Sequence, residues 1–138
     1  TTLLDLWLAP MLNLDPDGDP LDEVLGYVHT KLRMSRDYPR ESRLFAYEIL
    51  QGAPHLGDIL GGRLRDLVND TVAILAGWIA AGRLSRVDPH HLIFSIWALT
   101  QHYADFEVQV RAVLGPAQDP YVGADAYLDN LYRRMLAV

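Results

Sequence analysis

Residues 88–106 read DPHHLIFSIWALTQHYADF, and this stretch decides the fold class. It opens on Asp88-Pro89, where the aspartate can accept a hydrogen bond from an unpaired N–H and the proline suits the first helical position. Apolar residues then recur every three or four positions, which is the period of an α-helix. Gln101 and Asp105 interrupt the apolar run. A helix that only packs has little use for such groups, so they predict contact with water, a partner chain or a ligand.

The same helix-start signal recurs at Asp19-Pro20 and Asp119-Pro120, and Gly82 suits a left-handed helix end. Between these signals the apolar residues keep the helical spacing, and no stretch alternates as a β-strand does. The sequence therefore predicts an all-α fold of about six helices. After the end of one helix near residue 12, the expected helices span residues 20–37, 39–51, 57–82, 88–114 and 120–137.

Composition bounds the class of protein. A chain of 138 residues, 50% hydrophobic and 22% charged, is expected to form one globular domain over residues 1–138. It has no cysteine, which excludes disulfides and thiolate metal sites and fits a cytosolic location. No apolar run is long enough to span a membrane, and we do not expect the first residues to be a leader peptide. The net charge of −6 disfavours DNA binding by this chain alone.

The predicted helix at 88–114 carries more apolar surface than a single stripe. A helix that is apolar over most of its girth must be covered on two sides. We expect a second copy of the chain to provide one cover, with the last helix contributing to a four-helix interface around a two-fold axis. The alternative is that both helices are simply core. The expected interface residues are Leu92, Ile96, Leu99, Phe106, Val110, Tyr127, Leu128, Leu131, Tyr132 and Met135.

Three segments carry a resemblance to a known family. They are LDLWLAP at 4–10, SRDYPRESRLFAYEILQGAPHL at 35–56 and ILAGWIAAGRLSRVDPHHLIFSIWALTQHYADF at 74–106. Together they resemble the C-terminal regulatory domain of TetR-family repressors, most closely the pyrimidine-utilisation branch. The resemblance implies a ligand-sensing, dimerising domain that follows a DNA-binding head. We therefore expect residues 1–12 to be the remainder of a connecting helix whose preceding head is absent from this chain.

A candidate ligand site lies on the 88–114 helix. Trp97 and Gln101 are four residues apart and so project from one face. A glutamine amide can pair with the C=O and N–H edge of a cyclic imide, while an indole supplies a flat wall and one N–H donor. The resemblance adds Trp7 as a second indole and implies that a uracil-like or thymine-like effector releases the protein from DNA. Tyr47 and Tyr103 are expected at the edges of this pocket.

Several functions remain open from the residues alone. An enzyme could use His102, Tyr103 and Asp105 as acid–base groups, but no nucleophile–base pair supports it, so we expect no enzymatic activity. No histidine spacing matches a zinc site, and neither a metal nor another cofactor is expected. The remaining alternatives are a helical dimerisation module without an effector, and a sensor for a different small aromatic ligand.

Overall fold

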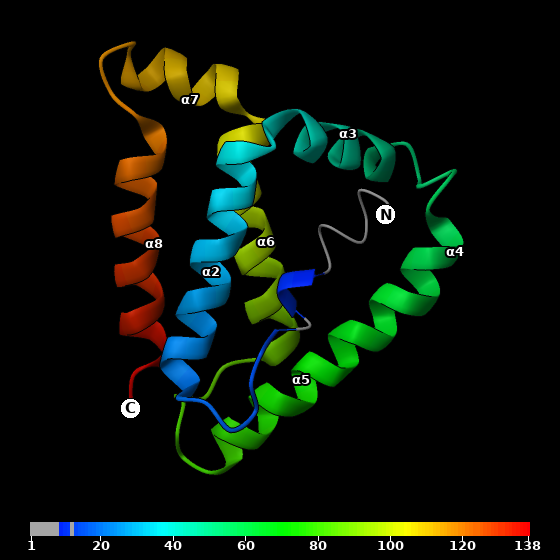
Figure 1. The fold of residues 1–138 in the computed structure, drawn as a ribbon, viewed down its shortest axis with the longest axis vertical. Coiled ribbons are helices and arrows are strands. Elements are labelled where there is room, and N and C mark those ends of the chain that lie inside the picture. Colours follow the sequence, from blue (N-terminus) through cyan, green and yellow to red (C-terminus); the bar gives the residue numbers. More distant parts are fainter. Residues whose placement is uncertain (1–8, 12) are drawn as a thin grey trace.

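The computed structural model describes residues 9–11 and 13–138, and the regular elements in this part of the chain are all helical (Figure 1). The predicted all-α fold is confirmed. None of the described helices is long and apolar enough to cross a membrane. The elements are α2 (Pro20–Asp37), α3 (Pro39–Leu50), α4 (Gly57–Ile59), the π-helical η1 (Leu60–Leu64), α5 (Arg65–Ala80), α6 (Pro89–Asp105), α7 (Glu107–Leu114) and α8 (Pro120–Leu136).

The three Asp-Pro pairs begin α2, α6 and α8, as the sequence predicts. In each pair the proline occupies the first turn and the aspartate carboxylate accepts a backbone N–H that has no partner within the helix. The bonds measure 3.0 Å from Asp22 to Asp19, 3.2 Å from His91 to Asp88 and 2.9 Å from Tyr121 to Asp119. These caps fix where the three helices start.

Two of the predicted helices depart from a continuous regular α-helix in the structure. The 88–114 segment breaks at Phe106, whose φ of −117° and ψ of 32° are not helical. The chain then turns, and α7 crosses the end of the bundle toward α8 (Figure 1). The 57–82 segment passes through η1, which contains the adjacent glycines Gly61 and Gly62. Glycine weakens an α-helix, while the apolar period runs on through both segments and so indicates neither the break at Phe106 nor the π-helical turn.

The core is built around α2, which lies between α6 and α8 (Figure 1). Apolar side chains from these three helices and from α5 form one buried cluster, and burying each large one contributes about 1.5–3 kcal/mol. Trp78 belongs to this cluster, and its indole N–H donates to the Pro16 carbonyl at 3.2 Å. Members of the cluster include Val24, Leu25, Val28 and Leu32 of α2, Leu75 of α5, Leu92, Ile93 and Ile96 of α6, and Leu128, Tyr132 and Leu136 of α8.

Four residues predicted for a dimer interface belong to this core instead. Leu92, Ile96, Leu128 and Tyr132 are each at most 2% exposed within the single chain, so their assignment to the interface is wrong. Helix α6 does not need a second chain as cover on two sides, because α2, α3, α5 and α8 of the same chain pack against it.

The other predicted interface residues remain accessible to a second copy of the chain. Four of them are exposed and two are partly buried. The exposed ones are Leu99, Phe106, Tyr127 and Met135, and the partly buried ones are Val110 and Leu131.

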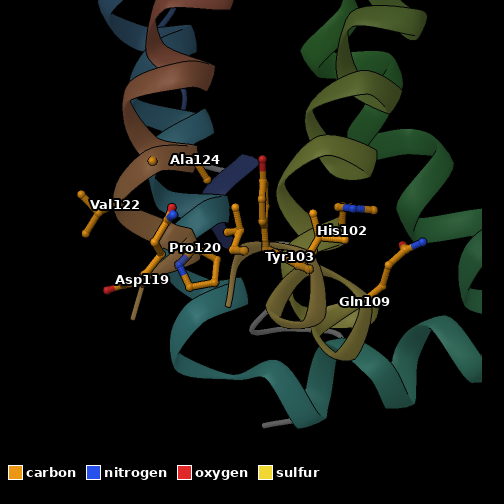
Figure 2. Close-up of a pocket in the computed structure, with 12 residues that line it drawn as sticks. His102, Tyr103, Gln109, Asp119, Pro120, Val122 and Ala124 are labelled. Carbon is orange, nitrogen blue, oxygen red and sulfur yellow. The ribbon is translucent and has the colours of Figure 1, made fainter. Parts of the chain in front are cut away.

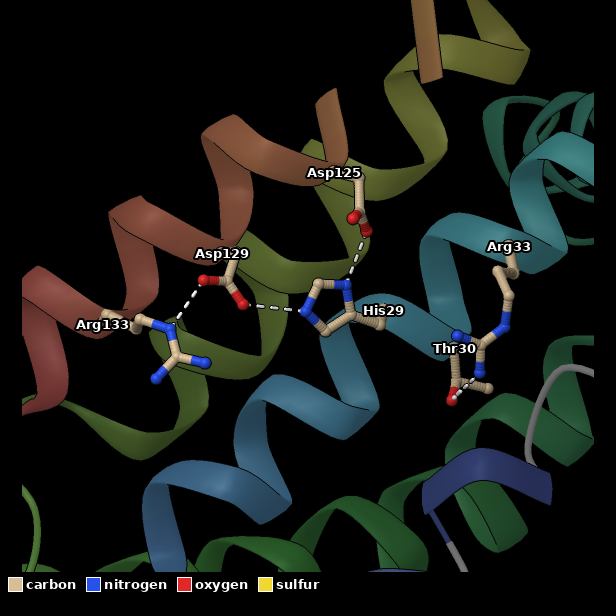
Figure 3. A network of polar contacts seen from close by, with 6 residues as sticks. All are labelled: His29, Thr30, Arg33, Asp125, Asp129 and Arg133. Atoms are coloured by element: carbon tan, nitrogen blue, oxygen red, sulfur yellow. Dashed lines mark hydrogen bonds and ion pairs between the residues drawn. The ribbon is translucent and has the colours of Figure 1, made fainter. Parts of the chain in front are cut away.

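A histidine joins α2 to α8 (Figure 3). His29 Nδ1 lies 2.6 Å from an Asp125 oxygen, and its Nε2 lies 2.9 Å from Asp129, which also accepts from Arg133 Nε at 2.6 Å. Both ring nitrogens can donate only in the imidazolium form. Burial by itself lowers the pKa of His29, but the hydrogen bonds to Asp129 and Asp125 outweigh it and raise that pKa above its ordinary value.

This contact predicts a pH-dependent contribution to stability. Because the folded-state pKa is raised, the contribution is fully present below the unfolded-state pKa of about 6.5 and is lost as pH rises through the folded-state value. We expect His29→Asn to lower the free energy of unfolding by up to about 1 kcal/mol at pH 6 and by less at pH 9. Urea unfolding at both pH values measures this difference. His55→Asn, at an exposed histidine, is the control, and an equal effect of His29→Asn at both pH values would contradict the prediction.

Candidate functional site

The candidate site is a cavity of about 750 Å³ between α3 and α6. This volume falls within the range of small-molecule pockets. Most of its lining is apolar, while four polar side chains face it. The apolar lining comprises Phe45, Ala46, Ile49, Leu50, Leu64, Trp97 and Phe106, and the polar side chains are Arg43, Tyr47, Gln101 and Asp105.

One face of α6 supplies the centre of this cavity. Trp97, Gln101 and Asp105 follow at intervals of four residues, so they lie above one another on successive turns. Gln101 is partly buried, and its amide makes no hydrogen bond to any residue that the structure describes. The predicted pair of Trp97 and Gln101 therefore lines one cavity, with an amide available to a bound molecule.

The indole of Trp97 is held in place by α2. Its Nε1–H donates to the Tyr27 hydroxyl at 2.8 Å, and Tyr27 is only 6% exposed. Burial raises the pKa of Tyr27 well above its ordinary value, although the bond from Trp97 opposes this, so the hydroxyl stays neutral. The expectation that the Trp97 N–H is an extra donor for the ligand is therefore wrong. The ring offers a wall of fixed orientation.

The other predicted site residues fall in different places. Tyr47 of α3 lines the same cavity at its rim, with 65% of its surface exposed. Tyr103 lines a separate hollow of about 690 Å³ between the end of α6, α7 and the start of α8 (Figure 2). It follows Gln101 by two residues, about 200° around the helix, so its grouping with Gln101 is wrong. Trp7 lies outside the described residues.

A polar contact between α6 and α3 was not predicted. The Ser42 hydroxyl, which is fully buried, donates to Asp105 Oδ1 at 2.6 Å. Beside it, Arg43 donates to the Ala104 carbonyl at 3.1 Å and lies 3.7 Å from Glu107. Burial raises the pKa of Asp105, while the bond from Ser42 and the charge of Arg43 oppose that rise. The pairing spans 63 positions, so no local sequence signal indicates it.

The groups considered for acid–base catalysis do not converge. The His102 ring stacks on Phe106, with ring centroids 5.3 Å apart, and lines the hollow that contains Tyr103. Asp105 lines the cavity on the α3 side. In the part of the chain that the structure describes, no three His, Cys, Asp or Glu side chains gather to hold a metal ion.

The hydrogen bond between Trp97 and Tyr27 predicts that removing the Tyr27 hydroxyl changes both the stability of the protein and the environment of the Trp97 indole. Tyr27→Phe leaves the Trp97 indole N–H without its acceptor, so we expect a loss of about 1 kcal/mol in the free energy of unfolding. The indole N–H proton resonance, assigned with Trp97→Phe, should move upfield. Tyr38→Phe is the control because the Tyr38 side chain is exposed. An unmoved Trp97 resonance in Tyr27→Phe would contradict the assigned bond.

Comparison with known proteins places the chain in a family. A family model described as "YcdC-like protein, C-terminal region" matches residues 1–137. The HTH-type transcriptional regulator RutR of Escherichia coli (strain K12) is 47% identical over 131 residues, which cover 95% of this chain and 62% of RutR. The regulators of the same name from Shigella flexneri and Escherichia coli O157:H7 match to the same extent. The chain thus spans 62% of the length of these relatives, which are named as transcriptional regulators. The resemblance predicted from the sequence is confirmed, and the chain belongs to the TetR family as a C-terminal region of the YcdC-like type.

Proposed function

We propose that this chain is the effector-sensing and dimerising region of a cytoplasmic transcriptional regulator, and that the cavity between α3 and α6 binds a small planar pyrimidine such as uracil or thymine. One observation carries the proposal. The Gln101 amide faces the cavity without a hydrogen-bond partner among the described residues, one helical turn from an indole of fixed orientation. A carboxamide offers both a donor and an acceptor on one planar end.

The chemistry of a cyclic imide fits these two side chains. In uracil, C4=O accepts and N3–H donates along one edge, so this edge can pair with the Gln101 amide through two hydrogen bonds. The flat ring can then lie against the face of Trp97. Trp7 remains a proposed second indole on the strength of the family resemblance, and Tyr47 would border the entrance. The relatives named RutR are transcriptional regulators, which supports a regulatory role for the site.

Regulation requires the ligand to distinguish two states of the protein. A ligand shifts an equilibrium only by its different affinities for those states. In the full-length regulator we propose that pyrimidine binding favours an arrangement of the DNA-binding heads that does not fit the operator. The cavity is shared by α3 and α6, so its shape depends on how these helices are placed relative to each other.

Calorimetry with uracil and thymine tests the proposed ligand class. We expect Gln101→Ala to weaken binding by about 10- to 100-fold, because two hydrogen bonds of about 0.5–1.5 kcal/mol each are lost. Gln109→Ala is the matched control, since Gln109 is an exposed glutamine that lines the other hollow (Figure 2). Equal heats for the unaltered protein and Gln101→Ala would refute the role of this amide.

A second candidate ligand class is favoured by the size of the cavity. A volume of about 750 Å³ exceeds what a single pyrimidine ring fills, and much of the lining is apolar. The same domain would then sense a larger aromatic molecule. Binding of a two-ring aromatic compound, with no heat from uracil or thymine, would favour this alternative over the pyrimidine.

We also propose that two copies associate through the exposed apolar side chains of α6 and α8, beginning with Leu99, Tyr127 and Met135. The double variant Tyr127→Asp with Met135→Asp should raise the dimer dissociation constant by more than about tenfold, because an unpaired buried charge costs more than about 1.4 kcal/mol. Size-exclusion chromatography with light scattering measures the mass. Leu44→Asp is the control, as Leu44 is an exposed apolar residue of α3. A monomeric unaltered protein at high concentration would contradict the dimer.

A further inference from the structure

We propose that Asp105 is a second ligand-reading residue of the α3–α6 cavity, which accepts a ring N–H from the edge of the ligand that Gln101 does not contact. The site would then select rings with an N–H on both edges and reject rings that present a bare nitrogen acceptor to Asp105. This inference rests on the proposed pyrimidine-binding function and adds a determinant of specificity to it.

The placement of the two side chains on α6 supports simultaneous contact with one ring. Gln101 and Asp105 are one turn apart and both line the cavity. Four residues of α-helix rise about 6 Å, so the two side chains leave the helix at separate points and can reach different edges of one small ring. Trp97 lies one turn before Gln101 on the same face, so the three side chains form a row along which a flat ligand can lie.

The Asp105 carboxylate is positioned from α3 and retains an oxygen for a ligand. The fully buried Ser42 hydroxyl donates to Oδ1 at 2.6 Å, which fixes the orientation of the carboxylate. Its Oδ2 makes no hydrogen bond to any described residue. The neighbouring Arg43 guanidinium also faces the cavity and is itself tied to the Ala104 carbonyl. One carboxylate oxygen is thus committed to the fold and the other is available.

An ionised carboxylate only accepts hydrogen bonds, which makes it selective. A ring N–H facing Oδ2 forms a charge-assisted bond, whereas a ring nitrogen with a lone pair opposes the carboxylate and leaves both groups without a partner. Sites built to bond a specific polar group reject analogues that lack it. Burial disfavours the charged form of Asp105 and raises its pKa, so an N–H donor from the ligand would replace part of the lost hydration.

The test compares uracil with 4(3H)-pyrimidinone, which keeps the C4=O and N3–H edge but has a bare nitrogen in place of N1–H. We expect the unaltered protein to bind uracil at least about tenfold more tightly in calorimetry. In Asp105→Asn, the amide oxygen can still accept from Ser42, and the amide N–H₂ then faces the ligand. The affinity for uracil should therefore fall by about tenfold or more, while the affinity for the pyrimidinone stays the same or rises. The preference for uracil is then lost or reversed.

The control separates specificity from a structural role. Gln101→Ala should lower the affinity for both compounds by the same factor, because both compounds have the C4=O and N3–H edge that Gln101 contacts. If Asp105→Asn also lowers the affinity for both compounds equally, Asp105 only links α6 to α3 and the inference is overturned.

Should Asp105→Asn fail to fold, 1-methyluracil on the unaltered protein replaces that measurement. A methyl at N1 should cost about tenfold or more, and full-affinity binding of 1-methyluracil would overturn the inference. If uracil does not bind the unaltered protein, the pyrimidine proposal fails and this inference falls with it, whereas uracil binding without discrimination sinks only the role of Asp105.

Discussion

The hydrogen bond between the Trp97 indole and the Tyr27 hydroxyl connects the cavity to the core. At 2.8 Å it joins α6 to α2, the helix that packs against both α6 and α8. The Tyr27 hydroxyl is buried, so the orientation of the indole is set by the same packing that holds the fold together. The indole wall of the cavity is therefore oriented by contacts with the core.

Helix α6 combines three roles on different faces. Leu92 and Ile96 point into the core, Trp97 and Gln101 line the cavity, and Leu99 is exposed. A rotation of 100° per residue allows this division within three turns. It also explains why α6 is apolar over so much of its girth without needing a second chain on two sides. Most of the apolar side chains of α6 therefore contact the core or the cavity of their own chain.

The sequence predicted the features that depend on local chemistry. The Asp-Pro caps located three helix starts, and the spacing of Trp97 and Gln101 placed both on one cavity-facing side. Periodicity shows that a face is apolar but not what covers it, so Leu128 and Tyr132 were assigned to an interface although their own chain buries them. Contacts across long separations, such as the one between Ser42 and Asp105, leave no pattern in a single sequence.

The two walls of the cavity are held by different contacts. On the α6 side, Trp97 is tied to the core helix α2. On the α3 side, the Ser42–Asp105 contact joins the wall to α6, while Tyr47 and Leu50 stand exposed at the rim. A ligand that touches both walls binds best at one spacing of the two helices. Its binding energy then depends on that spacing, and such differential affinity is the only means by which a ligand can bias a conformational equilibrium.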